Sequence, residues 1–503
     1  ELTLNTAQRE ALISVPRPIV ILPFKEYKGD LAIEAVAPGL RQMGVMLPYS
    51  GLLEMLAQEL TRPIVATSGN LHGSPILSSE QEATRILKGV ADYFVHHDLP
   101  IENPQDDSVV KISEEPTTRI MFRRSRGYAP NFFDFKSDSS ECIMAMGSQL
   151  KSTIAYLPNS YLYQSQYLGN LDNFDVYERF EKSFEGFVRI FEREPEIILV
   201  DGHPEYLSTK SGREYAEKVG AECFEIQHHM AHFASVLGEH ELFLSNEPVL
   251  GVIWDGTGYG SDEQIWGGEF FLYEDRVIKR WRHFEYFEWI AGDKMAKEPR
   301  LSLLALSDDT MLEDVSEKFS KEEKRIYLSL LEKKRLKTSS VGRLFDAAAS
   351  LLGLCDYNSY EGEAAILLEN HVGTYIFKEC SSFFNPGQKE LLSPHAIIQK
   401  MYLEMQLGKD TKSLALDFLF TLALIIKEQA IQSSVNKVAF SGGVFQNSIL
   451  VEMIQEMLQG EFETYFNVNL APNDENIAHG QMMYHIYEVQ SDADSEANSL
   501  RQS

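Results

Sequence analysis

The chain is poor in cysteine and in basic residues, and it lacks a long uninterrupted apolar run. Its 503 residues include four cysteines and no CxxC pair, so we expect neither a disulfide framework nor a zinc ribbon. The same scarcity of cysteine favours a reducing compartment, the cytoplasm. Lys and Arg number 46 against 75 Asp and Glu, a net charge of −29, which argues against coating nucleic acid or an anionic membrane. The longest apolar stretch, residues 414–426, is interrupted by Asp417 and predicts a buried helix rather than a membrane span.

What the chain does contain is a core-forming composition, with 44% apolar residues, in a length sufficient for several domains. Short apolar runs bounded by turn formers predict buried strands, and the helical stretches between them indicate an α/β layered fold. The predicted strands are residues 18–22 and 63–67 in the first part of the chain, then 143–146, 153–156, 197–200, 249–254 and 437–440.

Composition shifts divide the chain into domains. A polar connector at residues 134–141 separates a first domain, residues 1–133, from a second domain, residues 142–488. Within the second domain, the charged segment 308–338 predicts exposed amphipathic helices. The tail, residues 489–503, is expected to be disordered because it has almost no apolar content.

Glycine-bearing turns follow three predicted strands of the second domain. They are the turn at Gly147, the run Asp255-Gly256-Thr257-Gly258 and the run Ser441-Gly442-Gly443. Turns without Cβ atoms let backbone N–H groups approach phosphate oxygens, and a following helix N-terminus adds a favourable dipole. Plain tight turns are the alternative, but three such turns in one α/β unit, one with Lys151 four residues past its glycine, favour phosphate binding.

An acidic residue and two histidines point to a cation in the same domain. Asp255 would repel a bare phosphate unless a cation lay between them. His228 and His232 are four residues apart, which on a helix places both imidazoles on one face at a spacing suited to one divalent ion. Asp474 is a candidate third ligand, although spacing alone does not choose it over Asp255 or Glu475. Histidines without a metal are the alternative interpretation.

The first domain has a cationic cluster of its own. Within eight residues of an otherwise acidic chain stand Arg119, Arg123, Arg124 and Arg126. The planar guanidinium fork suits phosphate, and pairing with surface carboxylates is the alternative. Segments 67–70 and 106–108 lie beside predicted strands and offer hydroxyl, amide and carboxylate groups.

Together these motifs resemble those of known families. Residues 66–76, 106–110 and 124–130 are similar to a YrdC-like domain that forms carbamoyl adenylate. Segments similar to a TsaD-like domain, which has a duplicated actin-like (ASKHA) α/β fold, are residues 228–232, 255–260, 266–269, 342–346, 361–365 and 441–447. In this order the two domains resemble the HypF family of carbamoyltransferases in nickel–iron hydrogenase maturation, over about residues 12 to 488.

The resemblance implies a reaction at two sites. Carbamate derived from carbamoyl phosphate would react with ATP in the YrdC-like domain to give carbamoyl adenylate and pyrophosphate, and Mg²⁺ would be a further cofactor. The TsaD-like domain would then pass the carbamoyl group to the C-terminal cysteine of a partner, HypE, as a step toward the cyanide ligands of the hydrogenase iron. From the charge and the apolar runs, we expect no nucleic acid and no membrane to take part.

The resemblance also implies roles for individual residues. An iron or zinc ion would be held by His228, His232, Asp255 and Asp474, and the catalytic residues would be Asp255, His228 and His232. The nucleotide pocket of the second domain would be lined by Gly342, Asp346, Glu361, Gly442, Gly443 and Asn447. The nucleotide site of the first domain would use Ser68, Asn70, Ser108, Arg124 and Arg126.

The sequence departs from the family pattern at two points. Family members carry further modules and the first part of the YrdC-like domain ahead of Glu1, so we expect the first site of this chain to be incomplete and inactive. His479 stands where an aliphatic residue is expected.

Two other functions compete with carbamoyl transfer to a thiol. A tRNA threonylcarbamoyltransferase shares the second fold but usually lacks a fused YrdC-like domain, and the charge of −29 disfavours tRNA. A nucleotide-binding maturation scaffold without catalysis would use the same glycine turns.

Overall fold

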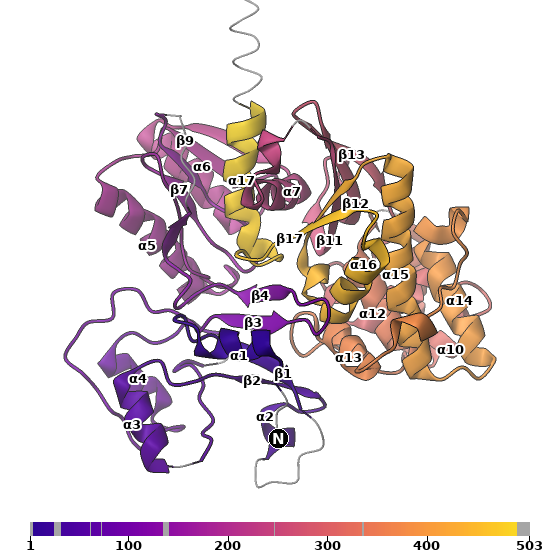
Figure 1. Ribbon diagram of the computed structural model, residues 1–503, viewed down its shortest axis with the longest axis horizontal. Coiled ribbons are helices and arrows are strands. Elements are labelled where there is room, and N and C mark those ends of the chain that lie inside the picture. Colours follow the sequence, from indigo (N-terminus) through magenta and orange to yellow (C-terminus); the bar gives the residue numbers. More distant parts are fainter. Residues whose placement is uncertain are drawn as a thin grey trace, which may run out of the picture.

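The first part of the chain is built on one four-stranded sheet, in the order β2–β1–β3–β4 (Figure 1). In this computed structural model the described residues are 4–24, 32–60, 62–71, 73–133, 140–245, 247–333 and 336–489. The strands of this sheet are β1 (Ile19–Pro23), β2 (Gln42–Val45), β3 (Val109–Ile112) and β4 (Arg119–Arg123). The accompanying helices are α1 (Thr6–Ile13), α2 (Ile33–Val36), α3 (Gly51–Leu60) and α4 (Glu80–Leu87).

Two larger mixed sheets form the rest of the molecule, with strand orders β10–β9–β6–β7–β8–β5 and β14–β15–β12–β11–β16–β17, and β13 paired to β12. The first contains β5 (Asn131–Phe133), β6 (Ile143–Ala145), β7 (Ala155–Leu157), β8 (Leu162–Gln164), β9 (Ile197–Asp201) and β10 (Glu222–Ile226). The second contains β11 (Val249–Tyr259), β12 (Ile265–Glu274), β13 (Val277–His283), β14 (Phe287–Glu288), β15 (Lys337–Thr338), β16 (Lys437–Ser441) and β17 (Glu463–Phe466).

Helices pack beside both sheets, which confirms the predicted α/β class (Figure 1). The helices that follow the first strands are α5 (Phe174–Phe191), α6 (Leu207–Val219) and α7 (His228–Glu239). A helical region then contains α8 (Lys294–Lys297), α9 (Pro299–Leu306), α10 (Leu312–Ser316), α11 (Lys321–Lys333), α12 (Val341–Leu351), α13 (Glu363–Val372), α14 (Pro394–Gln406) and α15 (Thr411–Ser433). The last two helices are α16 (Ser448–Leu458) and α17 (Ile477–Tyr484).

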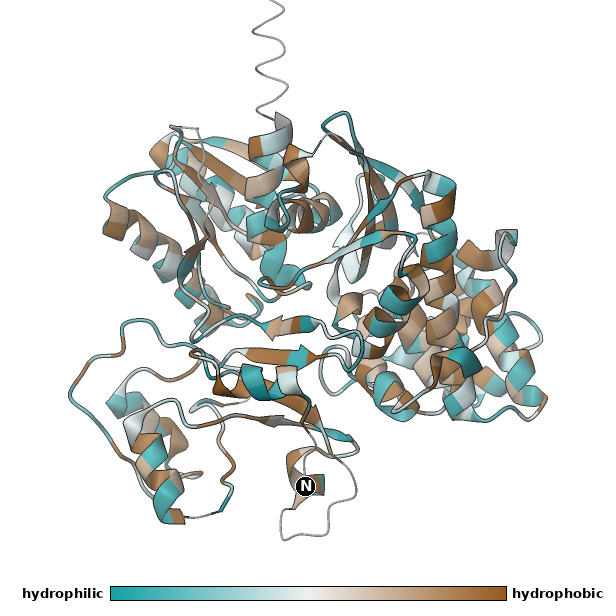
Figure 2. Cartoon of the chain, viewed as in Figure 1, coloured by the Kyte–Doolittle hydropathy of each residue, from teal (hydrophilic) through white to brown (hydrophobic). Residues whose placement is uncertain are grey.

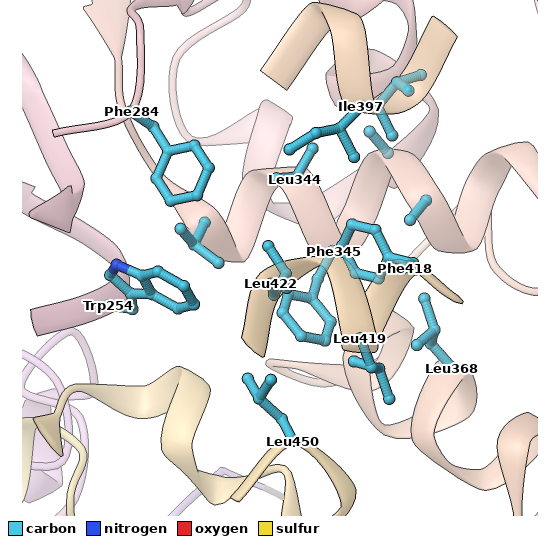
Figure 3. Packing of buried hydrophobic residues seen from close by; sticks show 14 of the residues in the cluster. Trp254, Phe284, Leu344, Phe345, Leu368, Ile397, Phe418, Leu419, Leu422 and Leu450 are labelled. Carbon is cyan, nitrogen blue, oxygen red and sulfur yellow. The ribbon is translucent and has the colours of Figure 1, made fainter. Parts of the chain in front are cut away.

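Helix α15 lies at the centre of the largest hydrophobic cluster, as the apolar run 414–426 predicts (Figure 3). Phe418 and Leu422 are fully buried, and Phe418 meets Phe345 of α12 edge to face with ring centroids 5.1 Å apart. Asp417, which interrupts the run, forms an ion pair with Lys409. Within the described residues, no helix is both long enough and apolar enough to cross a bilayer.

Most of the predicted strands are confirmed, and one is wrong. The runs at 18–22, 143–146, 153–156, 197–200, 249–254 and 437–440 fall on β1, β6, β7, β9, β11 and β16. Residues 63–67 form no strand, and Val65 is 69% exposed. An apolar run pairs only where a sheet offers it a free edge, and that long-range condition is invisible in the run itself.

The first part of the chain also exposes apolar side chains. None of the residues of α3 is buried, and Leu52 and Met55 are 66% and 67% exposed. Figure 2 shows hydrophobic and hydrophilic residues along this helix. Such an apolar helix face normally lies against another surface.

Only some of the predicted domain and segment boundaries fall within the described residues. Residues 134–139 of the connector and 490–503 of the tail lie outside the described residues. Strand β5, within the proposed first domain, pairs antiparallel with β8 of the next sheet. The charged segment 308–338 folds largely as the short helices α10 and α11 and leaves most of α11 accessible, as predicted. All four cysteines are free thiols.

Helices α7 and α17 pack so closely that their backbones are in contact at Gly480. A Cβ atom at Gly480 of α17 would lie 1.8 Å from the carbonyl oxygen of Ala231 in α7. A side chain at this position would therefore force the two helices apart, because the contact atom is backbone and cannot rotate away.

We expect Gly480→Ala to lower the free energy of unfolding by about 3 kcal/mol, since overpacking against backbone leaves no low-energy rotamer. Gly186→Ala, in α5 where a Cβ would meet nothing within 4 Å, serves as the matched control and should be neutral or stabilising by up to about 1 kcal/mol. Urea denaturation followed by circular dichroism measures both. Equal stability of the two variants would contradict the close packing of α7 and α17.

Candidate metal centre and nucleotide cleft

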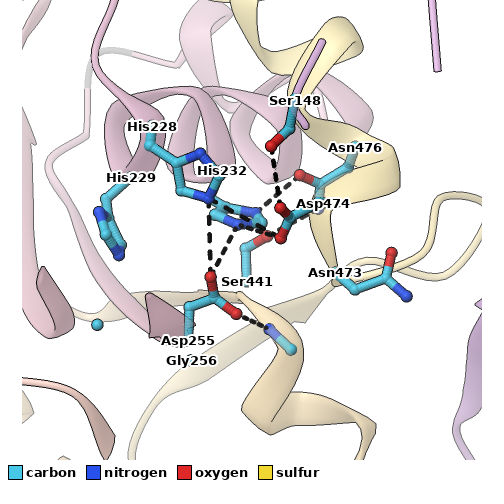
Figure 4. A network of polar contacts seen from close by, with 12 residues as sticks. Ser148, His228, His229, His232, Asp255, Gly256, Ser441, Asn473, Asp474 and Asn476 are labelled. Carbon is cyan, nitrogen blue, oxygen red and sulfur yellow. Dashed lines mark hydrogen bonds and ion pairs between the residues drawn. The ribbon is translucent and has the colours of Figure 1, made fainter. Parts of the chain in front are cut away.

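Four buried side chains converge at the junction of the two larger sheets (Figure 4). His228 and His232 come from α7, Asp255 from β11, and Asp474 from the short helix Asp474–Asn476 that precedes α17. One ligating atom from each residue lies within 4.8 Å of the corresponding atoms of the other three. The structure thus brings together all four residues that the resemblance assigns to a metal.

The local sequence explains how two of these segments reach the site. Gln227 caps α7, its side chain accepting a hydrogen bond from Met230 N at 2.9 Å, so the helix begins at His228. The register of β11 against β12 shifts between Trp254 and Gly258, which takes Asp255 out of the regular ladder. A Cβ at Gly258 would lie 2.7 Å from His228 Cδ2, so glycine permits the close approach of α7 to β11.

Hydrogen bonds to the outer nitrogens turn both imidazoles toward the centre. His228 Nδ1 lies 2.8 Å from Asp201 Oδ2, and His232 Nδ1 lies 2.8 Å from Asn476 Oδ1. The acceptor oxygens fix the proton on Nδ1 and leave Nε2 as the inward atom. Both Nε2 atoms are buried and lack a hydrogen-bond partner among the described residues.

The two carboxylates are held in the same manner, each by one oxygen. Asp255 Oδ1 accepts a hydrogen bond from Gly443 N at 3.1 Å, and Asp474 Oδ2 accepts one from Ser148 Oγ at 3.0 Å. Their other oxygens lie 3.7–3.9 Å from the inward histidine nitrogens. Two imidazoles and two carboxylates with free inward atoms are a donor set suited to zinc or iron.

Burial and mutual charge shift the protonation of this cluster strongly. Burial alone lowers the pKa of His228, but the carboxylates of Asp201 and Asp474 outweigh it and hold that pKa well above its usual value. Burial and the neighbouring charge of His228 lower the pKa of His232 to about 4. Burial also raises the pKa of Asp474. The cluster therefore retains protons that a divalent cation would displace.

A cleft of about 350 Å³ opens directly beside these residues. Asp255 and Asp474 belong both to the cluster and to the cleft wall. Of the residues assigned to a nucleotide by resemblance, those that line the cleft are Gly342, Asp346, Glu361, Gly443 and Asn447. Gly442 lies just behind the wall, where its N–H donates to Pro472 O at 2.7 Å. The volume falls within the range of small-molecule sites.

Charged side chains in the cleft wall occur in pairs. Lys151, which follows the turn at Gly147, forms an ion pair with Glu361. Arg343 Nη1 lies 3.1 Å from Asp346 Oδ2, and burial raises the pKa of Asp346 to about 6 against the opposing charge of Arg343. Lys151 and Arg343 are cations that a phosphate entering the cleft could recruit.

The residues assigned to the first site are only partly brought together. Ser108 Oγ donates to Arg126 O at 2.9 Å, and Arg126 Nε lies 2.6 Å from Asp107 Oδ1. Ser68 Oγ donates to Asn70 Oδ1 at 2.5 Å in a separate loop. In the part of the chain that the structure describes, no hydrogen bond or ion pair joins that loop to the arginines. Arg126 thus has a carboxylate partner in this structure, and its role at a phosphate stays a prediction.

Arg124 is buried in the interface between the first sheet and the loop that carries Asp474. Its backbone N–H donates to Glu475 Oε2 at 2.9 Å, and Asn473 Nδ2 donates to Phe122 O at 3.1 Å. Burial lowers the pKa of Arg124 to about 10. Glu475, an alternative ligand by spacing alone, thus contacts the first sheet instead of joining the four-residue cluster.

The unexpected His479 is buried in α17, with its ring 5.2 Å from that of Phe133. Burial, with a smaller contribution from Arg124, lowers its pKa to about 3. The imidazole is therefore neutral and packs as a side chain of low polarity, which explains how it replaces an aliphatic residue.

The sequence analysis missed the groups that orient the four clustered side chains. Asp201, Asn476 and Ser148 hold His228, His232 and Asp474 respectively. Asp201 directly follows the predicted strand 197–200, a position where functional side chains often gather, so that signal was present. Asn476 and Ser148 carry no comparable signal.

Three family models match successive parts of the chain. The model described as Telomere recombination, of the YrdC type, matches residues 3–125. The HypF Kae1-like domain matches residues 138–239, and the second subdomain of the carbamoyltransferase Kae1-like domain matches residues 251–481. The chain thus combines a YrdC-like domain with a Kae1-like domain of the ASKHA type.

Relatives match across nearly the whole chain. Carbamoyltransferase HypF of Synechocystis is 35% identical over 96% of this chain and 64% of its own length. The probable carbamoyltransferase HypF of Methanocaldococcus jannaschii is 33% identical over 95% of this chain and 63% of its own. The chain therefore spans somewhat less than two thirds of the length of these curated relatives.

A solved structure agrees with this match. The crystal structure of full-length HypF in its phosphate- and nucleotide-bound form superposes with a TM-score of 0.88 at 30% identity, covering 96% of this chain and 76% of that one. HypF of T. kodakarensis gives the same TM-score at 29% identity, covering 97% of this chain and 66% of that one. From its sequence and its fold, the chain belongs to the HypF family of carbamoyltransferases.

Proposed function

We propose that the second domain transfers a carbamoyl group from carbamoyl adenylate to the C-terminal cysteine thiol of HypE. The observation that carries this proposal is the pair of inward Nε2 atoms of His228 and His232, unpartnered in the described chain and facing two carboxylates at the end of a nucleotide-sized cleft. Membership of the HypF family supports it, as does the relative described as nucleotide-bound.

The proposed chemistry assigns a task to each part of the site. Iron or zinc held by His228, His232, Asp255 and Asp474 would supply Lewis-acid polarisation of the carbamoyl carbonyl. The cleft holds the adenylate, and Lys151 offers a positive charge for the phosphate of the leaving AMP. The acceptor thiol loses its proton, its sulfur forms a bond to the carbamoyl carbon, and the bond from that carbon to the phosphate oxygen breaks.

We further propose that the first domain belongs to the adenylate-forming step, with ATP and carbamate derived from carbamoyl phosphate as its reactants and Mg²⁺ as a cofactor. Ser68, Asn70, Ser108, Arg124 and Arg126 stay the proposed residues of that site. Because Arg126 is paired with Asp107, a triphosphate would have to displace this carboxylate to reach the guanidinium. The thiol chemistry of the acceptor suits the cytoplasm, where we place the reaction.

For the metal centre, we expect Asp201→Asn to weaken zinc binding about 10- to 100-fold, because the neutral amide no longer stabilises the protonated outer nitrogen of His228. His232→Ala removes a ligand and should weaken binding further. A competition titration with a chromophoric chelator measures both affinities. His240→Gln is the control, since His240 contacts Phe466 O outside the cluster. Full affinity in both test variants would end the metal proposal.

For the transfer reaction, we expect the zinc- or iron-loaded chain to modify the C-terminal cysteine of HypE when carbamoyl adenylate is supplied chemically. Mass spectrometry of the HypE C-terminal peptide follows the product, and a HypE variant with serine in place of that cysteine is the control. His232→Ala should lower the rate at least about 100-fold if polarisation of the carbonyl is lost. A metal-loaded protein that leaves the cysteine unmodified would favour the scaffold alternative.

For the cleft, we expect AMP binding to disappear in Ile366→Trp, because the indole would fill space that Ile366 now borders. Isothermal titration calorimetry measures the affinity. Ile376→Trp makes the same substitution at a side chain that is 59% exposed and outside the cleft, and it should bind AMP as the wild type does. Unchanged AMP affinity in Ile366→Trp would show that the nucleotide binds outside this cleft.

A further inference from the structure

Helix α13 both lines the nucleotide cleft and contacts the first domain, whose Phe122 also borders the cleft. Ala365, Ile366 and Glu369 of this helix line the cleft. The neighbouring Asn370 accepts a hydrogen bond from Arg41 N at 2.6 Å and donates one to Gly39 O at 3.1 Å. One wall of the cleft in the second domain is therefore fixed to the first domain.

A buried ion pair joins the same helix to the central part of the first sheet. Lys111 Nζ, from β3, lies 2.7 Å from Glu369 Oε1, and both side chains are 6% exposed. Burying two charges is costly unless each is paired and hydrogen-bonded. The pair is thus a specific arrangement across the domain interface and not an exposed contact.

Glu369 also connects α13 to a second wall of the cleft. Its Oε1 accepts hydrogen bonds from Ser448 N at 2.7 Å and Ser448 Oγ at 2.6 Å, at the start of α16. The preceding residue, Asn447, lines the cleft. The charge on Glu369 is therefore positioned where it acts on whatever the cleft binds.

We propose that Lys111 is a positioning residue through which the first domain sets the charge preference of the nucleotide cleft in the second domain. Lys111 neutralises Glu369, a carboxylate in the cleft wall that would otherwise repel phosphate. This inference rests on the proposed nucleotide-binding function of the cleft. It assigns to the first domain a role in the second site that is separate from the supply of adenylate.

The test compares the dissociation constants of adenosine, AMP and ATP, measured by isothermal titration calorimetry on the full chain. Lys111→Met leaves the carboxylate of Glu369 without its cation. We therefore expect the dissociation constant of adenosine to change less than about twofold, that of AMP to rise about 10-fold, and that of ATP to rise further. Binding that survives in Ile366→Trp belongs to another site and is subtracted. The double variant Lys111→Met, Glu369→Gln should have a dissociation constant for AMP within about threefold of the wild-type value.

Glu369→Gln alone gives an independent test with the opposite sign. It leaves the Lys111 ammonium uncompensated, so AMP and ATP should bind more tightly relative to adenosine. If Lys111→Met does not fold, this variant decides the question, with circular dichroism as the check on folding.

Asn370→Ala is the control that weakens the contact between α13 and the first domain without changing any charge. It removes the hydrogen bonds to Gly39 and Arg41, and it should change all three affinities by the same factor. Equal shifts for the three ligands in Lys111→Met, or an unchanged ratio in Glu369→Gln, would overturn the inference while the nucleotide site stands. A wild-type chain that binds none of the three ligands would overturn both.

Discussion

The candidate site depends on how closely three backbone segments approach one another. The four clustered side chains, which we propose as metal ligands, come from α7, from the irregular part of β11 and from the turn before α17. Gly258 and Gly480 lie where side chains would push these segments apart. Ligand geometry in this protein is therefore a consequence of packing between elements, and residues with no chemistry of their own determine it.

A second theme is the local balancing of buried charge. The chain carries a net charge of −29, yet the cleft wall pairs its acids with individual cations: Lys151 with Glu361, Arg343 with Asp346, and Lys111 with Glu369. At the four-residue cluster, the carboxylates of Asp201 and Asp474 hold the pKa of His228 well above its usual value, so the imidazole of His228 carries the balancing charge. An incoming phosphate or metal would change this balance of charges.

Much of the fold could be predicted from the sequence, because buried strands and the α15 helix leave strong apolar runs. The failure at residues 63–67 shows the limit, since strand pairing depends on a free sheet edge elsewhere in the chain. For the site, the i, i+4 spacing identified the two histidines, but spacing could not choose among Asp255, Asp474 and Glu475. The structure separates them through the interface in which Glu475 contacts Arg124. The binding of a metal and a nucleotide by these residues stays a prediction.

The contacts of Asn473 and Glu475 with the end of β4 have a consequence for folding energetics. Because backbone groups of Phe122 and Arg124 supply these hydrogen bonds, the loop that carries Asp474 cannot open without exposing polar groups of the neighbouring sheet to water. Opening of this loop therefore also breaks hydrogen bonds to the first sheet, which couples local unfolding of the loop to the stability of that sheet. A substitution that destabilises the first sheet would in this way also destabilise the loop that carries Asp474.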